Sequence, residues 1–347
     1  MNGVGASEHH HGEILQGAVR RDGKVVPCLI TMPTRRVGSL ARYIPVAEWS
    51  AVAGAARAVL RRAPEGGVQG AAPSLSAVAG ASRLAPGAVE LGVEFPPARV
   101  ARVLEVVPAW KLKAARAARL ALEFVGAPAG GGRLEIECSV ATGVGLGSST
   151  CDVVAAIRAV CAAFGAAVEP DIVARLAVAA EGAVDPIMFD REVVLFAQRQ
   201  GRVLETFGSW APPYVVVSID TDAGTDGIDT LSLPPPQYAE AELEAFEGLV
   251  ARARAAFERR DAAAIAVVAT ESATLNQRFL PLRCFREIVA LASEFRALGV
   301  QIAHSGTVAG ILFDVRTTPA LTSEVIARVR LLGVRPLGVF ETGADAD

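Results

Sequence analysis

The feature that most constrains the fold of this chain is a glycine-rich turn. It lies between a segment in which apolar and polar residues alternate and a segment whose apolar residues have helical spacing. The turn spans residues 143–150 and reads Gly-Val-Gly-Leu-Gly-Ser-Ser-Thr. Residues 134–140 alternate between apolar and polar side chains, which predicts a strand with one buried face. The apolar residues from 153 to 164 recur at the spacing of one helix face. We therefore expect the glycines between a strand and a helix N-terminus.

This position makes the turn a candidate anion site. The first N–H groups of a helix lack partners within the helix, and the helix dipole is positive there. Glycine lets the backbone approach a phosphate without a Cβ in the way. The hydroxyls of Ser148 and Ser149 could cap the helix or reach a metal bound to that phosphate. The alternative is a glycine turn with a serine cap and no ligand.

Two common phosphate-binding motifs do not fit this turn. A Walker P-loop carries a lysine before its serine or threonine, and residues 143–150 contain no lysine. A dinucleotide-binding turn has the pattern Gly-x-Gly-x-x-Gly, whereas this one has Gly-x-Gly-x-Gly. The turn is therefore expected to be another class of phosphate site.

Composition narrows the class of protein. The chain has 347 residues, enough for two domains, and a net charge of −3 with 5% aromatic residues, which argues against nucleic-acid binding. Charges interrupt every long apolar stretch, so we expect no membrane span, and the N-terminus lacks a secretory pattern. The five cysteines have no metal-binding spacing. These features favour a cytoplasmic protein with reduced cysteines.

The chain is expected to form two domains of the α+β class. We predict an N-terminal domain over residues 1–207, with a low-complexity insertion at 51–95, and a C-terminal domain over 208–347. Gly208, Pro212 and Pro213 interrupt the pattern at the boundary. The second half predicts the order strand, two or three helices, two strands, helix, strand. That order is the split-βαβ or ferredoxin-like arrangement.

The opening segment contains three consecutive histidines, at positions 9–11. Adjacent side chains point in different directions, so this spacing does not favour a metal site. We instead expect residues 6–17 to form a loop that brings Glu13 and a histidine toward a bound substrate. A solvated N-terminal loop is the alternative.

A pair of carboxylates, Glu181 and Asp185, follows the apolar pattern of a second helix. At this spacing they share a helix face if the helix continues that far. Two such carboxylates repel unless a cation or proton lies between them, and Mg²⁺ on a nucleotide would supply that cation. A neighbouring carboxylate could then orient or deprotonate an attacking hydroxyl. A charged helix end that faces water is the simpler interpretation.

A polar loop in the second half links two predicted strands. It spans His304–Gly310 and contains the one histidine outside the N-terminal tract. Such a loop at strand ends could reach a ligand from the far side of a cleft. A structural histidine is the alternative.

Taken together, these segments resemble the GHMP kinases, a superfamily that includes galactokinase and the homoserine, mevalonate and phosphomevalonate kinases. Gly-Leu-Gly-Ser-Ser at 145–149 resembles the second motif of that superfamily. Gly-Glu-Ile-Leu-Gln-Gly at 12–17 and the Glu181–Asp185 pair are similar to the L-threonine kinase branch linked to cobalamin synthesis and propanediol utilisation. The third motif would fall at His304–Gly310.

The resemblance implies a fold and a set of site residues. The fold would be a ribosomal-protein-S5-domain-2-like α/β domain followed by a ferredoxin-like domain. Asp185 would be catalytic, and Ser148, Ser149 and Glu181 would hold Mg²⁺. The implied substrate-binding residues are Glu13, His304, Ser305, Gly306 and Thr307. The implied ATP-binding residues are Gly143, Gly145, Leu146, Gly147, Ser148, Ser149 and Thr150.

The implied activity is transfer of the γ-phosphate of ATP, with Mg²⁺, to the hydroxyl of a small amino acid, in first place L-threonine. Homoserine or a specialised-metabolite alcohol would use the same machinery, and a non-catalytic nucleotide-sensing protein would keep the same cleft. Asp185 would act as a base or only orient the substrate, and catalysis by proximity alone stays open. The expected partner is a small hydroxyl-bearing molecule, not a nucleic acid or a membrane, and a homodimer is compatible with it.

Overall fold

The computed structural model describes residues 1–46, 103–128, 130–139, 147–190, 192–222, 233, 236–304 and 307–343. The predicted insertion at 51–95 and most of the glycine turn lie outside these residues. Within them, secondary structure follows the predicted segments closely, with two corrections given below.

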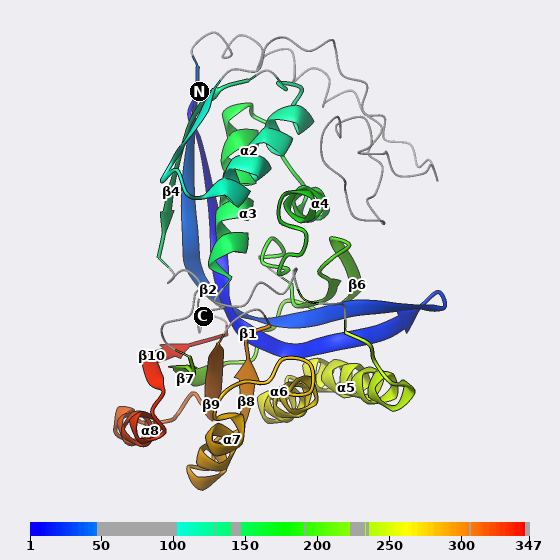
Figure 1. Ribbon diagram of the computed structural model, residues 1–347, viewed down its shortest axis with the longest axis vertical. Coiled ribbons are helices and arrows are strands. Elements are labelled where there is room, and N and C mark those ends of the chain that lie inside the picture. Colours follow the sequence, from blue (N-terminus) through cyan, green and yellow to red (C-terminus); the bar gives the residue numbers. More distant parts are fainter. Residues whose placement is uncertain are drawn as a thin grey trace.

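A ten-stranded sheet joins the two halves of the molecule, in the order β10-β7-β9-β8-β1-β2-β4-β3, with β5 pairing β2 and β6. Its longest strands are β1 (Gly3–Arg21) and β2 (Lys24–Pro45), which form one antiparallel hairpin. Figure 1 shows this hairpin running through the upper half and then turning to cross the lower half. The shorter strands of the first half are β3 (Leu104–Val107), β4 (Gly132–Cys138), β5 (Val194–Ala197) and β6 (Arg202–Thr206).

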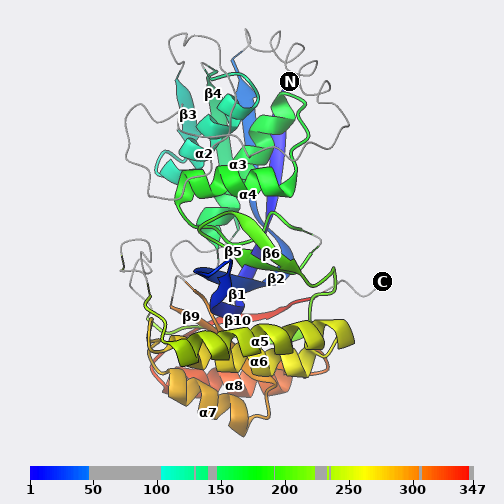
Figure 2. The ribbon, with the colours of Figure 1, turned by 90° about the vertical axis from the view of Figure 1, so that its right-hand side faces the viewer.

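Three helices pack on the upper part of the sheet: α2 (Leu112–Phe124), α3 (Ser148–Ala163) and α4 (Pro170–Glu181). Figure 1 and Figure 2 show α3 between the β1–β2 hairpin and the other two helices, and α3 contacts both strands. Consequently 13 of its 16 residues are buried, mostly alanine, valine and cysteine. Small side chains let the helices approach closely, so the first turn of α3 is held firmly by the core around it.

The second half confirms the predicted split-βαβ order. It contains β7 (Tyr214–Asp220), α5 (Glu240–Arg259), α6 (Ala262–Asn276), α7 (Phe285–Glu294), β8 (Gly299–Ile302), β9 (Val308–Asp314), α8 (Pro319–Leu331) and β10 (Arg335–Glu341). The four strands pair antiparallel. The four helices lie beneath the sheet in Figure 2, where they cover one face of it and bury its apolar side chains.

The prediction of a loop over residues 6–17 is wrong, because this segment is part of β1. Its pairing with β2 shifts register at four places between Ser7 and Leu15. Such bulges re-aim side chains, so the polar residues do not follow a period of two. Residues 10–19 are buried on both faces, which removes the alternation that marks a half-exposed strand.

The expectation that Glu181 and Asp185 share one helix face is also wrong. Helix α4 ends at Glu181, and Gly182 follows it with φ +91°. Glycine adopts this left-handed backbone at little cost, which ends the helix there. The chain then turns back, so Asp185 reaches the site from a loop. The simpler interpretation, a charged helix end facing water, fails as well, since both carboxylates are buried.

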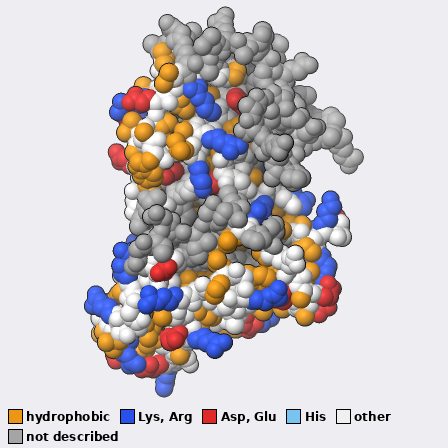
Figure 3. All heavy atoms as spheres, viewed as in Figure 1, with side chains coloured by type: hydrophobic (Ala, Val, Ile, Leu, Met, Phe, Trp, Pro, Cys, Tyr) orange, Lys and Arg blue, Asp and Glu red, His pale blue; other side chains and the backbone are white. Residues whose placement is uncertain are grey.

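The exposed surface carries mixed charge. On the face drawn in Figure 3, lysine and arginine side chains are interspersed with acidic and hydrophobic ones. Among the helices that the structure describes, none combines the length and the apolar character needed to cross a membrane.

Candidate active site

The described end of the glycine turn begins α3, as predicted. Gly147 is the N-cap residue and has φ +71°. A Cβ at this position would lie 2.3 Å from Nε2 of His10. Both the backbone angle and the close approach require glycine here. Gly143, Gly145 and Leu146 lie outside the described residues, so the contacts predicted for them stay predictions.

The carboxylate of Glu181 lies beside the first turn of α3. Its Oε2 accepts a hydrogen bond from the Thr150 hydroxyl at 3.2 Å, and its Oε1 accepts one from Lys113 Nζ at 2.9 Å. Glu181 is 8% exposed. Burial raises the pKa of Glu181, and the charge of Lys113 opposes that rise. The sequence-predicted proximity of Glu181 to the turn is therefore confirmed, and Lys113 is a partner that the sequence did not reveal.

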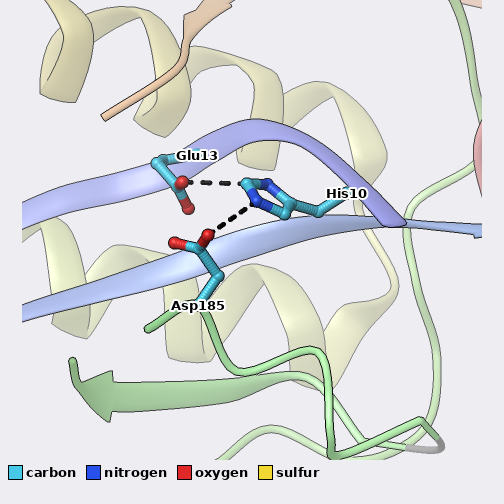
Figure 4. Close-up of side chains that lie close together, drawn as sticks. All are labelled: His10, Glu13 and Asp185. Carbon is cyan, nitrogen blue, oxygen red and sulfur yellow. Dashed lines mark hydrogen bonds and ion pairs between the residues drawn. The ribbon is translucent and has the colours of Figure 1, made fainter. Parts of the chain in front are cut away.

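Asp185 lies on the other side of the same threonine. The Thr150 hydroxyl is 3.5 Å from Asp185 Oδ2, and the ring Nε2 of His10 is 2.9 Å from that oxygen. The other ring nitrogen, Nδ1, lies 3.8 Å from Oε1 of Glu13. Figure 4 shows the three side chains pointing toward one another, His10 and Glu13 from β1 and Asp185 from the loop after α4. We call His10, Glu13 and Asp185 the Asp185 cluster.

Burial controls the electrostatics of the Asp185 cluster. Burial by itself lowers the pKa of His10, but the charge and hydrogen bond of Asp185 and the charge of Glu13 outweigh it and raise the pKa to about 9. Burial favours the neutral form of Asp185 too, yet His10 outweighs it and holds the pKa of that carboxyl below its usual value. Burial raises the pKa of Glu13 against the opposing charge of His10. The cluster therefore holds one carboxylate firmly ionised beside α3.

Several polar atoms of this cluster have no hydrogen-bond partner among the residues that the structure describes. They are both carboxylate oxygens of Glu13, Nδ1 of His10 and Oδ1 of Asp185. The three residues are 2%, 2% and 5% exposed. Buried polar atoms without partners cost stability and commonly mark sites that bind or react.

Only one end of the loop predicted to carry the third motif lies near the Asp185 cluster. His304 Nδ1 lies 3.7 Å from Asp185 Oδ1, so this end of the loop reaches the Asp185 cluster, and its contact with a substrate stays a prediction. Thr307 instead donates a hydrogen bond to Asp220 Oδ1 at 2.6 Å and is buried against β7. Asp220 thus holds the Thr307 hydroxyl, and the role of Thr307 in substrate binding stays a prediction. Ser305 and Gly306 lie outside the described residues.

A pocket opens beside the Asp185 cluster. Its lining includes His9, His10, Thr31, Pro186, Phe189 and Val194. The wall combines apolar side chains with the acidic residues Glu8, Asp190 and Glu192, and the His10 ring, which lines it, also contacts Asp185. A small molecule in this pocket would present its polar end to the cluster.

The three consecutive histidines do not converge, as their spacing predicts. His10 faces Asp185, whereas His11 Nε2 lies 2.7 Å from Ser218 Oγ, on β7. The side chain of Gln301 contacts the other ring nitrogen of His11. Burial lowers the pKa of His11 to about 3. His11 is thus a neutral residue that joins β1 to the second half, and only His10 is placed for chemistry.

A second buried cluster lies around Asp152, two residues beyond Thr150 on α3. Asp152 accepts hydrogen bonds from Lys111 Nζ at 2.6 Å and from Ser39 Oγ at 2.7 Å. We call Ser39, Lys111 and Asp152 the Asp152 cluster. The pattern of the sequence gave no sign that Lys111 meets Asp152 or that Lys113 meets Glu181, 41 and 68 residues away. Long-range ion pairs of this kind have no local periodicity to reveal them.

The first turn of α3 fits a nucleotide-bound Mg²⁺ by the chemistry of its donors. Ser148 and Ser149 offer hydroxyls, and Glu181 offers a carboxylate, which are the oxygen ligands that this ion prefers. Glu181 is already paired with Lys113, so the ion would share that carboxylate or displace the lysine.

The arrangement as a whole places two kinds of chemistry next to each other. A helix N-terminus preceded by glycines attracts an anion such as a phosphate. An ionised carboxylate, Asp185, lies within reach of its first turn through Thr150. Such a pair can bring a phosphoryl group and a hydroxyl together.

Comparisons with known proteins agree with this site. Residues 112–189, which run from α2 to the loop after Asp185, match the family described as GHMP kinases N terminal domain. The L-threonine kinase of Citrobacter freundii is 25% identical over 183 residues, which are 52% of this chain and 62% of that protein. The chain thus matches less than two thirds of that relative's length.

Solved structures extend the likeness to the whole chain at the level of fold. Homoserine kinase from Cytophaga hutchinsonii superposes with a TM-score of 0.59 at 14% identity, covering 98% of this chain and 94% of that one. A mevalonate kinase from L. major, solved with R-mevalonate, gives 0.54 at 13% identity, covering 100% and 97%. Residues 112–189 therefore match the N-terminal domain of the GHMP kinases, and the chain as a whole has the two-domain fold of these solved kinases.

Proposed function

We propose that this protein is a kinase that transfers the γ-phosphoryl group of ATP to the hydroxyl of a small amino acid, with L-threonine as the first candidate. The observation that carries the proposal is the buried, ionised Asp185 beside the first turn of α3, in contact with Thr150. The relative that is an L-threonine kinase and the matched domain support it.

Each part of the site has a role in this proposal. The glycine turn and the N-terminus of α3 would bind the phosphates through backbone N–H groups. Asp185 would orient the acceptor hydroxyl and take its proton, and the pocket beside His10 would receive the rest of the acceptor. Ser148, Ser149 and Glu181 would hold Mg²⁺, which neutralises phosphate charge when bound.

The domain organisation of the chain and its location in the cell are also proposals. We place the domain boundary near residue 207, with the nucleotide bound in residues 1–207 and the ferredoxin-like domain after it. The free cysteines and the use of ATP fit a reducing compartment, so we propose a cytoplasmic location.

A coupled assay of ADP release over a panel of hydroxy amino acids and amino alcohols tests this function. L-threonine is expected to give the largest rate with Mg-ATP, and mass spectrometry should find a product heavier by one phosphate. L-homoserine is the main competitor, since a homoserine kinase shares the fold. ATP binding without turnover on any alcohol would contradict the enzyme and favour a nucleotide-sensing protein. Glu181→Ala should abolish Mg²⁺-dependent turnover while the protein stays folded.

A further inference from the structure

We propose that His10, Glu13 and Asp185 form a binding site for a divalent transition-metal ion, separate from the Mg²⁺ of the nucleotide. One nitrogen or oxygen atom of each residue lies within 4.8 Å of the others. The proposed ligands are Nε2 of His10 and the carboxylates of Glu13 and Asp185. Both oxygens of Glu13 and Oδ1 of Asp185 are buried and have no hydrogen-bond partner among the residues that the structure describes.

The unpartnered atoms are the second, independent observation that points to an ion. All three side chains are more than nine-tenths buried, so water does not satisfy these atoms from bulk solvent. Two buried carboxylates side by side need a proton or a cation nearby. His10 does not meet this need at Glu13 through a hydrogen bond, because its Nδ1 is 3.8 Å from Oε1 of Glu13.

A metal ion would satisfy these oxygens and take the place of the hydrogen bond between His10 and Asp185. Nε2 of His10 lies 2.9 Å from Oδ2 of Asp185, which is close to the separation of two atoms bound to one metal ion. With Nδ1 protonated, the neutral ring of His10 leaves Nε2 as a ligand. Metal–ligand bonds of about 2.1 Å place ligand atoms roughly 3–4 Å apart, so the most distant pair of atoms, at up to 4.8 Å, needs to approach by about 1–2 Å.

The donor set selects the class of ion. One imidazole nitrogen and two carboxylates suit Zn²⁺, Mn²⁺, Co²⁺ or Fe²⁺, whereas Mg²⁺ prefers oxygen ligands alone. Zn²⁺ is expected to bind more tightly than Mn²⁺ in such a site. The proposed Mg²⁺ ligands at the start of α3 are hydroxyls and a different carboxylate, so the two sites are chemically distinct.

Three protein ligands leave one or more positions open on the ion. The pocket lined by His9, His10 and Thr31 borders the cluster, and Gly147 packs against the ring of His10 on its other side. If the proposed function holds, an oxygen of the acceptor alcohol takes the open position next to the phosphate-binding turn. This role rests on the proposed kinase activity, whereas metal binding itself does not.

Calorimetric titration of the full chain with metal alone tests the site. The protein is produced without a polyhistidine tag, stripped with a chelator and titrated with ZnCl₂, MnCl₂ or MgCl₂ in the absence of nucleotide. We expect one Zn²⁺ per chain, bound at least about tenfold more tightly than Mg²⁺. No saturable Zn²⁺ binding, or equal affinity for Zn²⁺ and Mg²⁺, would overturn the proposal. Because neither ATP nor acceptor is present, this result is independent of kinase activity.

Two matched variants locate the bound ion. Glu13→Gln keeps the size of the side chain and should weaken Zn²⁺ binding at least about tenfold, because a carboxylate ligand is lost. His9→Gln removes the neighbouring histidine, which lies outside the cluster, and should leave the affinity unchanged. The reverse pattern would mean that the histidine tract binds the metal at the surface. Far-UV circular dichroism confirms that each variant is folded.

Two measurements on the wild-type protein avoid dependence on any variant. Co²⁺ in the site should give visible absorption bands of a four- or five-coordinate ion with nitrogen and oxygen ligands. Crystals soaked in ZnCl₂ should show anomalous scattering between His10, Glu13 and Asp185. Octahedral Co²⁺ bands only, or anomalous density elsewhere, would overturn the assignment.

Discussion

The Asp152 cluster and the Asp185 cluster are both buried around the first turns of α3, but they differ in how their atoms are satisfied. Lys111 and Ser39 each contact one oxygen of Asp152. In the Asp185 cluster, four atoms have no hydrogen-bond partner within the described part of the chain, although burial is similar. An ion pair whose polar atoms are all hydrogen-bonded is typical of a structural role, whereas buried polar atoms without hydrogen bonds are typical of a ligand-binding site.

The largest expected effect is a loss of activity, and it comes from a substitution that changes only the Asp185 cluster. Asp185→Asn removes the ionised carboxylate and keeps its shape, so kcat of the proposed kinase should fall by about 10²- to 10⁴-fold. Asp171→Asn, in the first turn of α4 and exposed, is the control and should stay within about twofold. ADP release measures both variants. Near wild-type turnover in Asp185→Asn would mean that proximity alone carries catalysis.

The second expected effect is a loss of stability, and it comes from a substitution that changes only the Asp152 cluster. Asp152→Ala leaves the buried ammonium of Lys111 without its partner, which should lower the free energy of unfolding by about 3–5 kcal/mol. Urea denaturation measures the change. The double variant Lys111→Met/Asp152→Leu removes both charges and should recover most of the loss. If Asp152→Ala costs nothing, the ion pair is not structural.

The same measurement on Glu13 sharpens the contrast. Glu13 lacks hydrogen-bond partners in its buried position, so Glu13→Gln in metal-free buffer should change stability far less than Asp152→Ala does. A loss as large as that of Asp152→Ala would show that Glu13 is held by contacts equal to those of the Asp152 cluster.

A third effect is the pH dependence of stability in the presence of a chelator. His10 has a folded pKa of about 9 against an ordinary value of 6.5, so its stabilising contribution is complete below pH 6.5 and lost as the pH rises through 9. The pKa of Glu13 is raised too, which also favours the folded state at the lower pH.

The groups that face His10 are Glu13 on β1 and Asp185 after α4, with His9, His11 and His304 nearby. We therefore expect the melting temperature of the metal-free protein to fall between pH 6.5 and 9. His10→Gln should flatten that slope. A melting temperature that rises over this range would contradict the charge state assigned to the cluster.

The smallest expected effect separates backbone strain from steric contact at the phosphate turn. Gly147→Ala places a methyl group against the His10 ring at a residue with φ +71°, and should cost about 2–3 kcal/mol and weaken ATP binding. Gly126→Ala has φ +75° but no atom within 4 Å, so only the backbone cost of about 1 kcal/mol remains. Equal losses in both variants would show that His10 does not press on the turn.

Much of the fold was predictable because most segments carry a clear local pattern. The order of strands and helices in the second half was predicted, and α3 begins after the glycine turn as predicted. The long strand β1 was mistaken for a loop, since bulges and burial on both faces removed its alternation. Local periodicity cannot report a strand that is covered from both sides.

The sequence predicted which residues belong to the site better than it predicted which of them contact one another. Glu181, Asp185 and the start of α3 come together as expected, but through a chain reversal at Gly182 and not along one helix face. His10, Lys113 and Lys111 were not assigned contacts from the sequence, because their partners lie 175, 68 and 41 residues away. Nothing in one sequence pairs such distant charges.

A crystal structure with a non-hydrolysable ATP analogue, Mg²⁺ and L-threonine tests the central claim most directly. The account predicts the terminal phosphate at the N-terminus of α3, next to Gly147 and Thr150, with the threonine hydroxyl between that phosphate and the carboxylate of Asp185. A nucleotide bound away from α3, or a hydroxyl far from Asp185, would contradict it.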